Sequence, residues 1–108
     1  MVLLLVFSIT AQAAQTRAVQ VYPSLSFSGT TATCKATVIA DHSGDRISVT
    51  VKLWKGAACL KTWTASGNGS VSIQKTATVT SGQTYKLTVN ATINGVAQPQ
   101  QSVTRTCP

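Results

Sequence analysis

The residues best suited to chemistry lie in one short segment, "DHSGD", at residues 41–45. It holds the single histidine of the chain, His42, and both of its acids, Asp41 and Asp45. A hydrolase needs a nucleophile, a base and an orienting carboxylate in a chain of hydrogen bonds, which so short a loop cannot easily hold. We therefore interpret the segment as a polar turn, in which Asp and Ser side chains bind backbone groups and Gly44 supplies a positive φ. Weak calcium binding by the two carboxylates is the alternative.

A second group of residues combines indole rings with cations around one predicted turn near residue 56. Rings beside cations suit stacking on sugars or contact with an anionic polymer. The alternative is that Trp63 belongs to the core and Trp54 only caps the sandwich. Two further lysines lie on strands that should be neighbours, whereas Lys35 should lie on the opposite sheet. The candidate ligand-binding residues are Lys52, Trp54, Lys55, Lys61, Trp63 and Lys86.

Three cysteines, Cys34, Cys59 and Cys107, predict one disulfide and one leftover thiol if the protein is exported. Cys34 lies in the middle of a predicted strand among small apolar residues, where a free cysteine acts as a small hydrophobe. We predict a disulfide between Cys59 and Cys107, with Cys34 to Cys107 as the second possibility. The first pairing must bring together two strands that the usual order separates, within about 7 Å between Cα atoms.

The first 13 residues, "MVLLLVFSITAQA", form an apolar run that ends in a small-x-small pattern. This pattern is typical of a signal peptide, and the run is too short to span a membrane. A buried first strand is the alternative. We expect a flexible segment at 14–21 and one domain at 22–108, because a chain of this size supports one core. The expected localisation is secreted and extracellular, without stable membrane insertion.

The charge balance is strongly basic: nine Lys and Arg against two acids give a formal net charge of +7. Such a balance favours anionic partners, such as a cell-wall polymer, an acidic glycan or lipid head groups. The alternative is that cations spread over many strands only keep the protein soluble. We expect a monomer without cofactor or metal, and we do not expect a nucleic acid partner.

Side chains after residue 18 alternate between apolar and polar with period two, which predicts β-strands. The central strand, 46–54, alternates most regularly. Pro23 and Pro99 mark edge strands, and "NG" at 94–95 predicts a type I′ hairpin. We also expect a loop at "SGNG", residues 66–69, and a bulge near residues 75–76. The seven predicted strands are 19–27, 31–40, 46–54, 57–63, 70–79, 85–91 and 96–107.

Seven short strands with this spacing resemble an all-β, seven-stranded antiparallel immunoglobulin-like, or fibronectin-III-like, β-sandwich. The run "TSGQTYKLTVNA", residues 80–91, is similar to strand F of fibronectin type III modules. This resemblance implies that the Tyr85 hydroxyl bonds back to the preceding corner. Leu87 stands where an immunoglobulin domain would have a disulfide cysteine.

The chain also resembles small secreted DUF6147-like proteins of unknown function from Gram-positive bacteria. The matching segments are "YPSLSFSGTTATCKATV" at 22–38, "ISVTVKL" at 47–53, the Leu60 and Trp63 pair, and "VTSGQTYKLTVNATINGVAQ" at 79–98. That resemblance implies no activity. We expect a non-enzymatic secreted binding or accessory module that meets anionic surfaces such as a cell-wall polymer or glycan. The alternative is a cationic secreted effector, either an inhibitor or an antibacterial factor.

Overall fold

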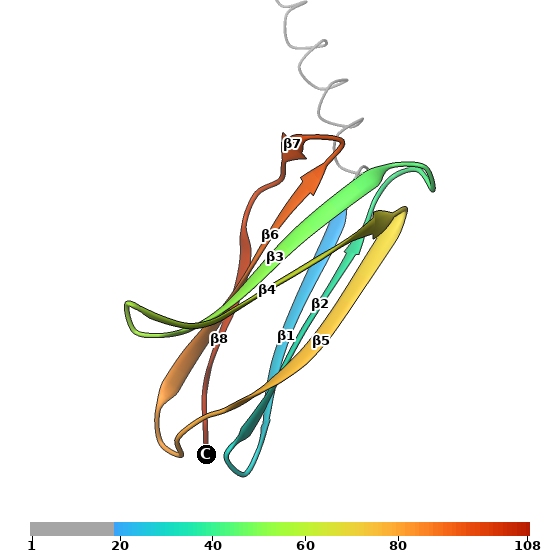
Figure 1. Cartoon of the computed structure of the whole chain (residues 1–108). Helices are drawn as coiled ribbons and strands as arrows, with labels where there is room; N and C mark the ends of the chain where they lie inside the picture. Colours follow the sequence, from blue (N-terminus) through green and yellow to red (C-terminus); the bar gives the residue numbers. More distant parts are fainter. Residues whose placement is uncertain (1–18) are drawn as a thin grey trace, which may run out of the picture.

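A computed structural model describes residues 19–108, which form two antiparallel β-sheets packed as a sandwich (Figure 1). The expected signal peptide, 1–13, and most of the expected flexible segment lie outside the described residues. The first sheet has the order β1-β2-β5, with β1 Gln20–Ser28, β2 Thr31–Ile39 and β5 Ser70–Thr78. The second has the order β4-β3-β6, with β3 Arg46–Lys55, β4 Ala58–Asn68 and β6 Thr84–Ile93. Two short strands, β7 Val96–Ala97 and β8 Gln101–Thr106, pair with the free side of β6.

The core lies between the sheets and follows the predicted alternation. On β3, Ile47, Val49, Val51 and Leu53 are each at most 1% exposed, and this strand lies between β4 and β6 as predicted for a central strand. Val38 on β2 faces them from the other sheet and is fully buried. The all-β class is therefore confirmed. In the described part of the chain, no helix has the length and apolarity needed to cross a membrane.

The corner between β5 and β6 is held by Tyr85. Its side chain is 2% exposed, and its hydroxyl oxygen accepts a hydrogen bond from the Thr80 backbone N–H at 2.8 Å. The ring also packs against Phe27 of β1, with 6.0 Å between ring centroids. This confirms the role predicted for Tyr85, and Leu87 is fully buried beside it on the same strand.

The hairpin after β6 forms as predicted. Asn94 and Gly95 both have positive φ, 51° and 84°, as a type I′ turn requires. The predicted strand 96–107 is instead two strands, because residues 98–100, which include Pro99, are not in strand conformation. Ile93 pairs with Val96, so the hairpin register is set before this interruption.

Two expectations about strands are wrong. The "SGNG" segment is not a loop, because β4 continues to Asn68 and only Gly69 separates it from β5. The pairing of β2 with β5 runs without a register shift, because residues 71, 73, 77 and 79 already share one face and need no bulge. The bulge lies instead between β3 and β4, where Leu60 is the extra residue between Cys59 and Lys61. β1, at Gln20–Ser28, lies close to the predicted first strand, 19–27.

Charged side chains occupy inward positions on three edge strands. Lys75 on β5 pairs with buried Cys34, Lys61 on β4 with buried Leu53, and Arg105 on β8 with buried Tyr85. All three cations are nevertheless exposed, because an edge strand leaves a way out to solvent. On the remaining edge, β1 carries Pro23. Charges and prolines at these positions prevent another strand from adding to the sheet.

The predicted disulfide between Cys59 and Cys107 is absent, and all three cysteines are free. Cys59 lies on β4 and Cys107 follows β8, so β3 and β6 separate them in one sheet. At about 4.8 Å per strand, this exceeds the reach of a disulfide. The second pairing is not formed either, because Cys107 lies at the β1–β2 turn, where its Sγ donates to the Gly29 carbonyl at 3.4 Å. Cys34 lies on β2, five residues after Gly29, and is not at this turn.

The corner bond predicts a specific loss of stability. Tyr85→Phe leaves the part-buried Thr80 N–H without its acceptor, so the free energy of unfolding should fall by about 1–2 kcal/mol. Urea denaturation measures this change. Tyr22→Phe is the matched control, because Tyr22 is 52% exposed and its hydroxyl donates only to the Gln20 side chain, so the change should stay within about 0.5 kcal/mol. Equal losses in the two variants would contradict the role of the corner.

Thiol labelling tests the cysteine arrangement. Cys59 is exposed, whereas Cys34 and Cys107 are buried, and burial raises the pKa of the Cys34 thiol to about 11. Because the thiolate is the reactive form, native protein at pH 8 should label rapidly at Cys59 alone. Denaturant without reductant should expose all three thiols. Cys59→Ser should remove the rapid phase, and fewer than three thiols in the denatured protein would show that a disulfide exists.

Candidate functional site

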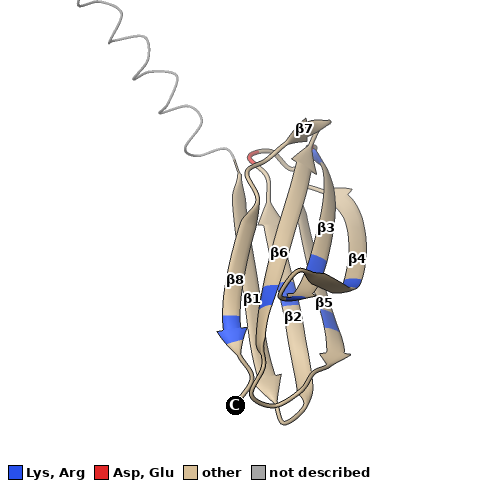
Figure 2. Ribbon diagram, turned by 90° about the vertical axis from the view of Figure 1, so that its left-hand side faces the viewer, with Lys and Arg blue, Asp and Glu red and all other residues tan. Residues whose placement is uncertain are grey.

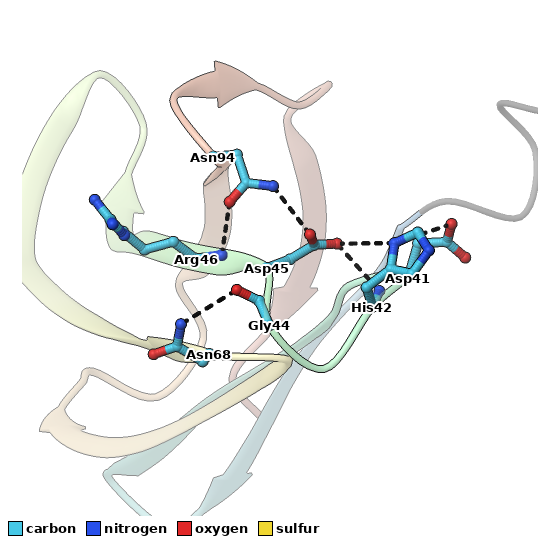
Figure 3. A network of polar contacts seen from close by, with 7 residues as sticks. All are labelled: Asp41, His42, Gly44, Asp45, Arg46, Asn68 and Asn94. Carbon is cyan, nitrogen blue, oxygen red and sulfur yellow. Dashed lines mark hydrogen bonds and ion pairs between the residues drawn. The ribbon is translucent and has the colours of Figure 1, made fainter.

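The "DHSGD" segment forms the turn between β2 and β3, and its polar side chains point to neighbouring connections (Figure 3). One carboxylate oxygen of Asp45 accepts a hydrogen bond from the Asn94 amide nitrogen at 3.0 Å, and the other accepts the His42 backbone N–H at 3.1 Å. The Asn94 amide oxygen in turn accepts the Arg46 backbone N–H at 2.9 Å. Asp45 therefore links the β2–β3 turn to the β6–β7 hairpin.

Backbone hydrogen bonds add the β4–β5 turn to this cluster. The Gly69 N–H donates to the Asp45 carbonyl at 2.9 Å, and the Gly69 carbonyl accepts the Ala40 N–H at 2.8 Å. Gly69 has φ +78°, and a Cβ atom there would lie 2.9 Å from the Ser43 carbonyl oxygen. Only glycine fits this crossing between the sheets. We call Asp45, Asn94 and Gly69, with the backbone they bind, the loop clasp.

The side chains of the clasp bind one another and the neighbouring backbone. The His42 side chain is 75% exposed, and its Nδ1 lies 3.6 Å from one carboxylate oxygen each of Asp41 and Asp45. Among residues 19–108, no group of three or more His, Cys, Asp or Glu side chains is arranged to hold a metal. The predicted side-chain to backbone bond of the turn is present, but Gly44 does not have a positive φ. The positive φ is found at Gly69, in a different connection.

These contacts lower the pKa of Asp45. The largest cause is the hydrogen bond from the Asn94 side chain, followed by the bond from the His42 backbone N–H. A carboxylate with a lowered folded-state pKa stabilises the fold above its unfolded-state pKa, near 3.9, and loses that contribution as pH falls through the folded-state value. The clasp should therefore weaken below about pH 4.

A pH series tests this clasp. We expect the urea midpoint of the wild type to fall more steeply than that of Asp45→Asn between about pH 4 and pH 2, because only the wild type must protonate Asp45. Asn94→Gly, which keeps the positive φ and removes the side-chain bond, should raise the pKa of Asp45, measured from its carboxyl carbon by NMR. Parallel pH curves for wild type and Asp45→Asn would refute the linkage.

The candidate binding residues divide between two faces of the second sheet. Trp54 and Lys86 are cross-strand partners on its outer face, and the Lys52 Nζ lies 5.8 Å from the centroid of the Trp54 ring. Trp63 pairs with buried Val51 on the inner side and packs partly against the core, and Lys61 also lies at an inward position. The structure therefore places the two indole rings on opposite faces of the sheet, and Trp63 is partly buried against the core. We call Lys52, Trp54 and Lys86 the lysine face.

The indole N–H of Trp54 and part of its ring already have partners within the protein. Its indole N–H donates to the Thr88 hydroxyl oxygen at 3.0 Å, and the Thr88 side chain is buried although it lies on an outer face. The cation–π contact with Lys52 occupies part of the ring. The arrangement presents two ammonium groups beside a fixed ring, which suits contact with anions better than stacking on a sugar.

Charge is distributed unevenly along the sandwich (Figure 2). Arg17 lies outside the described residues, and Arg46 directly follows Asp45 at the start of β3, at the clasp end (Figure 3). The remaining blue segments lie along the middle and the opposite half of the strands, away from the acidic turn. Lys55 lies exposed at the end of β3, next to the lysine face. An anionic surface would be attracted most strongly away from the clasp.

Sequence reasoning missed two residues of this region, Thr88 and Leu60. Thr88 alternates as an outward polar residue, and its burial depends on an indole from a neighbouring strand. Leu60 lies within β4 but is 42% exposed, because the bulge changes the strand face at that point. A separate cleft of about 220 Å³ lies between β1 and the C-terminal end, and it is lined by Ser26, Phe27, Arg105, Thr106 and Pro108.

Comparisons with known proteins show the fold and no family. No family model matches the chain, so the resemblance to DUF6147-like proteins finds no support there. No curated protein matches it either. A solved structure of the sensor domain of the anti-sigma factor RsgI4 from Pseudobacteroides cellulosolvens is similar, with a TM-score of 0.52 and 14% identity over 83% of this chain and 96% of that one. The described residues thus form an all-β domain similar in fold to that sensor domain.

Proposed function

We propose that this protein is a non-enzymatic, exported binding module that meets anionic extracellular surfaces, such as a cell-wall polymer or an acidic glycan, through its lysine face. The observation that carries the proposal is the separation of charge. Both acids are at the clasp, whereas Lys52, Lys86 and Lys55 stand together on or beside the outer face of the second sheet. A surface of one sign attracts and orients a partner of the other.

The geometry of the lysine face supports a role in contact. The Trp54 ring is fixed by its bond to Thr88, and Lys52 is held near it. Lys86 projects from the neighbouring strand at the register position of Trp54. Because Lys52 is already held near the ring, it loses less side-chain entropy when a ligand binds. The residues of the clasp, in contrast, bind one another and offer no comparable surface.

We further propose that the sandwich is immunoglobulin-like, of the fibronectin-III type. Support comes from the tyrosine corner at Tyr85 and from a three-stranded sheet packed on a larger one. Domains of this architecture serve widely as recognition modules. The structurally similar RsgI4 domain is described as a sensor, which agrees with recognition without catalysis, although 14% identity carries no more than the fold.

Binding to charged beads tests the proposal. The protein should bind dextran sulfate beads and not neutral dextran beads, and bound protein should elute as salt rises, because ions screen exposed charges. The double variant Lys52→Gln/Lys86→Gln should bind about tenfold more weakly, which corresponds to about 1.4 kcal/mol.

The matched control removes the same number of charges from the other sheet. Lys35→Gln/Lys75→Gln has the same net charge as the test variant, and its exposed side chains lie on β2 and β5. It should retain most of the binding. Equal losses in the two double variants would mean that net charge alone, and not the lysine face, is responsible.

A further inference from the structure

The turn between β3 and β4 extends away from the rest of the sandwich. Figure 1 shows this hairpin reaching beyond the other strands, and Figure 2 shows it from its outer side. Lys55 pairs with Ala58 across a two-residue loop in which Gly56 has φ +60°. Every residue from 55 to 61 is exposed. We call residues 55–61 the hairpin tip.

The hairpin tip presents apolar side chains to solvent. Ala57, Ala58 and Leu60 are exposed, and Leu60 is 42% exposed although it lies within β4. It is the extra residue of the bulge, with Lys61 opposite Leu53 and Cys59 opposite Trp54. Bulges re-aim a side chain, and here the bulge leaves a leucine without a place in the core. This leucine is available to a partner.

Cations surround the apolar tip. Lys55 and Lys61 lie at its two ends, and the lysine face, with Lys52 and Lys86, begins on the strand next to Cys59. The acids of the chain, Asp41 and Asp45, are at the opposite end, in the clasp. The tip therefore combines apolar contact with positive charge and has no nearby carboxylate among the described side chains.

This combination separates two kinds of anionic surface. A charged polymer satisfies lysines but gives Leu60 no apolar environment, whereas a bilayer offers phosphate groups above hydrocarbon. Apolar residues flanked by lysines suit the boundary between head groups and acyl chains, where lysine stems lie along the apolar layer and their ammonium groups stay in water. Each basic residue near an anionic leaflet adds attraction.

We propose that the hairpin tip docks on the surface of an anionic lipid bilayer, with Leu60 entering the interface and Lys55 and Lys61 contacting head-group phosphates. The inference rests on the proposed function and specifies its surface. Docking is peripheral and reversible, because one leucine and two alanines cannot anchor the protein without the charges. Binding therefore needs both the insertion of Leu60 and the attraction of the lysines to the head groups, and the test removes each of them separately.

Vesicle sedimentation tests the proposal on the whole chain. Vesicles of phosphatidylglycerol and phosphatidylcholine should bind the protein at low salt more tightly than vesicles of phosphatidylcholine alone. Leu60→Ser should weaken binding to the anionic vesicles at least fivefold, and so should Lys55→Gln/Lys61→Gln. Val96→Ser is the control, because Val96 is 63% exposed on β7, at the clasp end. Residues 1–18 are the same in all variants, so differences in vesicle binding between them come from the substituted positions.

The native thiol next to Leu60 gives a second readout. A solvent-sensitive fluorophore attached to exposed Cys59 should shift to shorter wavelength on anionic vesicles and stay unchanged on dextran sulfate. Cys34→Ala/Cys107→Ala ensures that the label is at Cys59, and thermal unfolding checks that each variant folds. Retained binding to dextran sulfate with equal vesicle binding by wild type and Leu60→Ser would overturn the inference alone. If the wild type binds neither dextran sulfate nor anionic vesicles, the proposed function would be overturned as well.

Discussion

The burial of alternate side chains on β3 and β6 is the constraint on which the rest of the structure depends. These two strands pair with each other, and each has a further neighbour on its other side. Their inward residues, such as Val51 and Val89, are almost fully buried, which fixes which face of each strand meets the core. Because side chains alternate with period two, the outward residues are fixed at the same time. Lys52 and Lys86 reach solvent on the outer face because Leu53 and Leu87 are buried.

The same alternation gives cations a second role at the sheet edges. Lys61, Lys75 and Arg105 occupy inward positions on edge strands, where an apolar residue would extend the core but invite another strand. Part of the positive charge therefore protects the edges, and only part of it is gathered on one surface. For this reason the net charge of the chain could not identify a binding surface, and the register of the strands was needed to separate the two groups.

The sequence predicted what depends on local pattern. The central strand, the 94–95 hairpin and the Tyr85 corner each follow from alternation or from turn residues within a few positions. What depends on distant partners could not be predicted: the separation of Cys59 from Cys107, the burial of Thr88 under Trp54, and the crossing at Gly69. The bulge at Leu60 is an intermediate case. A single inserted residue exchanges the two faces of a strand, and the alternation beside it reads equally well in either register.

The two ends of the sandwich differ in how strongly the fold constrains their residues. At the clasp, both carboxylate oxygens of Asp45 accept hydrogen bonds from within the fold, one from the Asn94 side chain and one from the His42 backbone N–H. At the hairpin tip, Leu60 contributes little to the core because a large part of its surface stays in water. The clasp residues are thus constrained by the fold, whereas the tip can change without loss of packing. If the tip docks on a surface as proposed, substitutions that change this contact leave the hydrogen bonds of the clasp in place, because the two regions lie at opposite ends of β3.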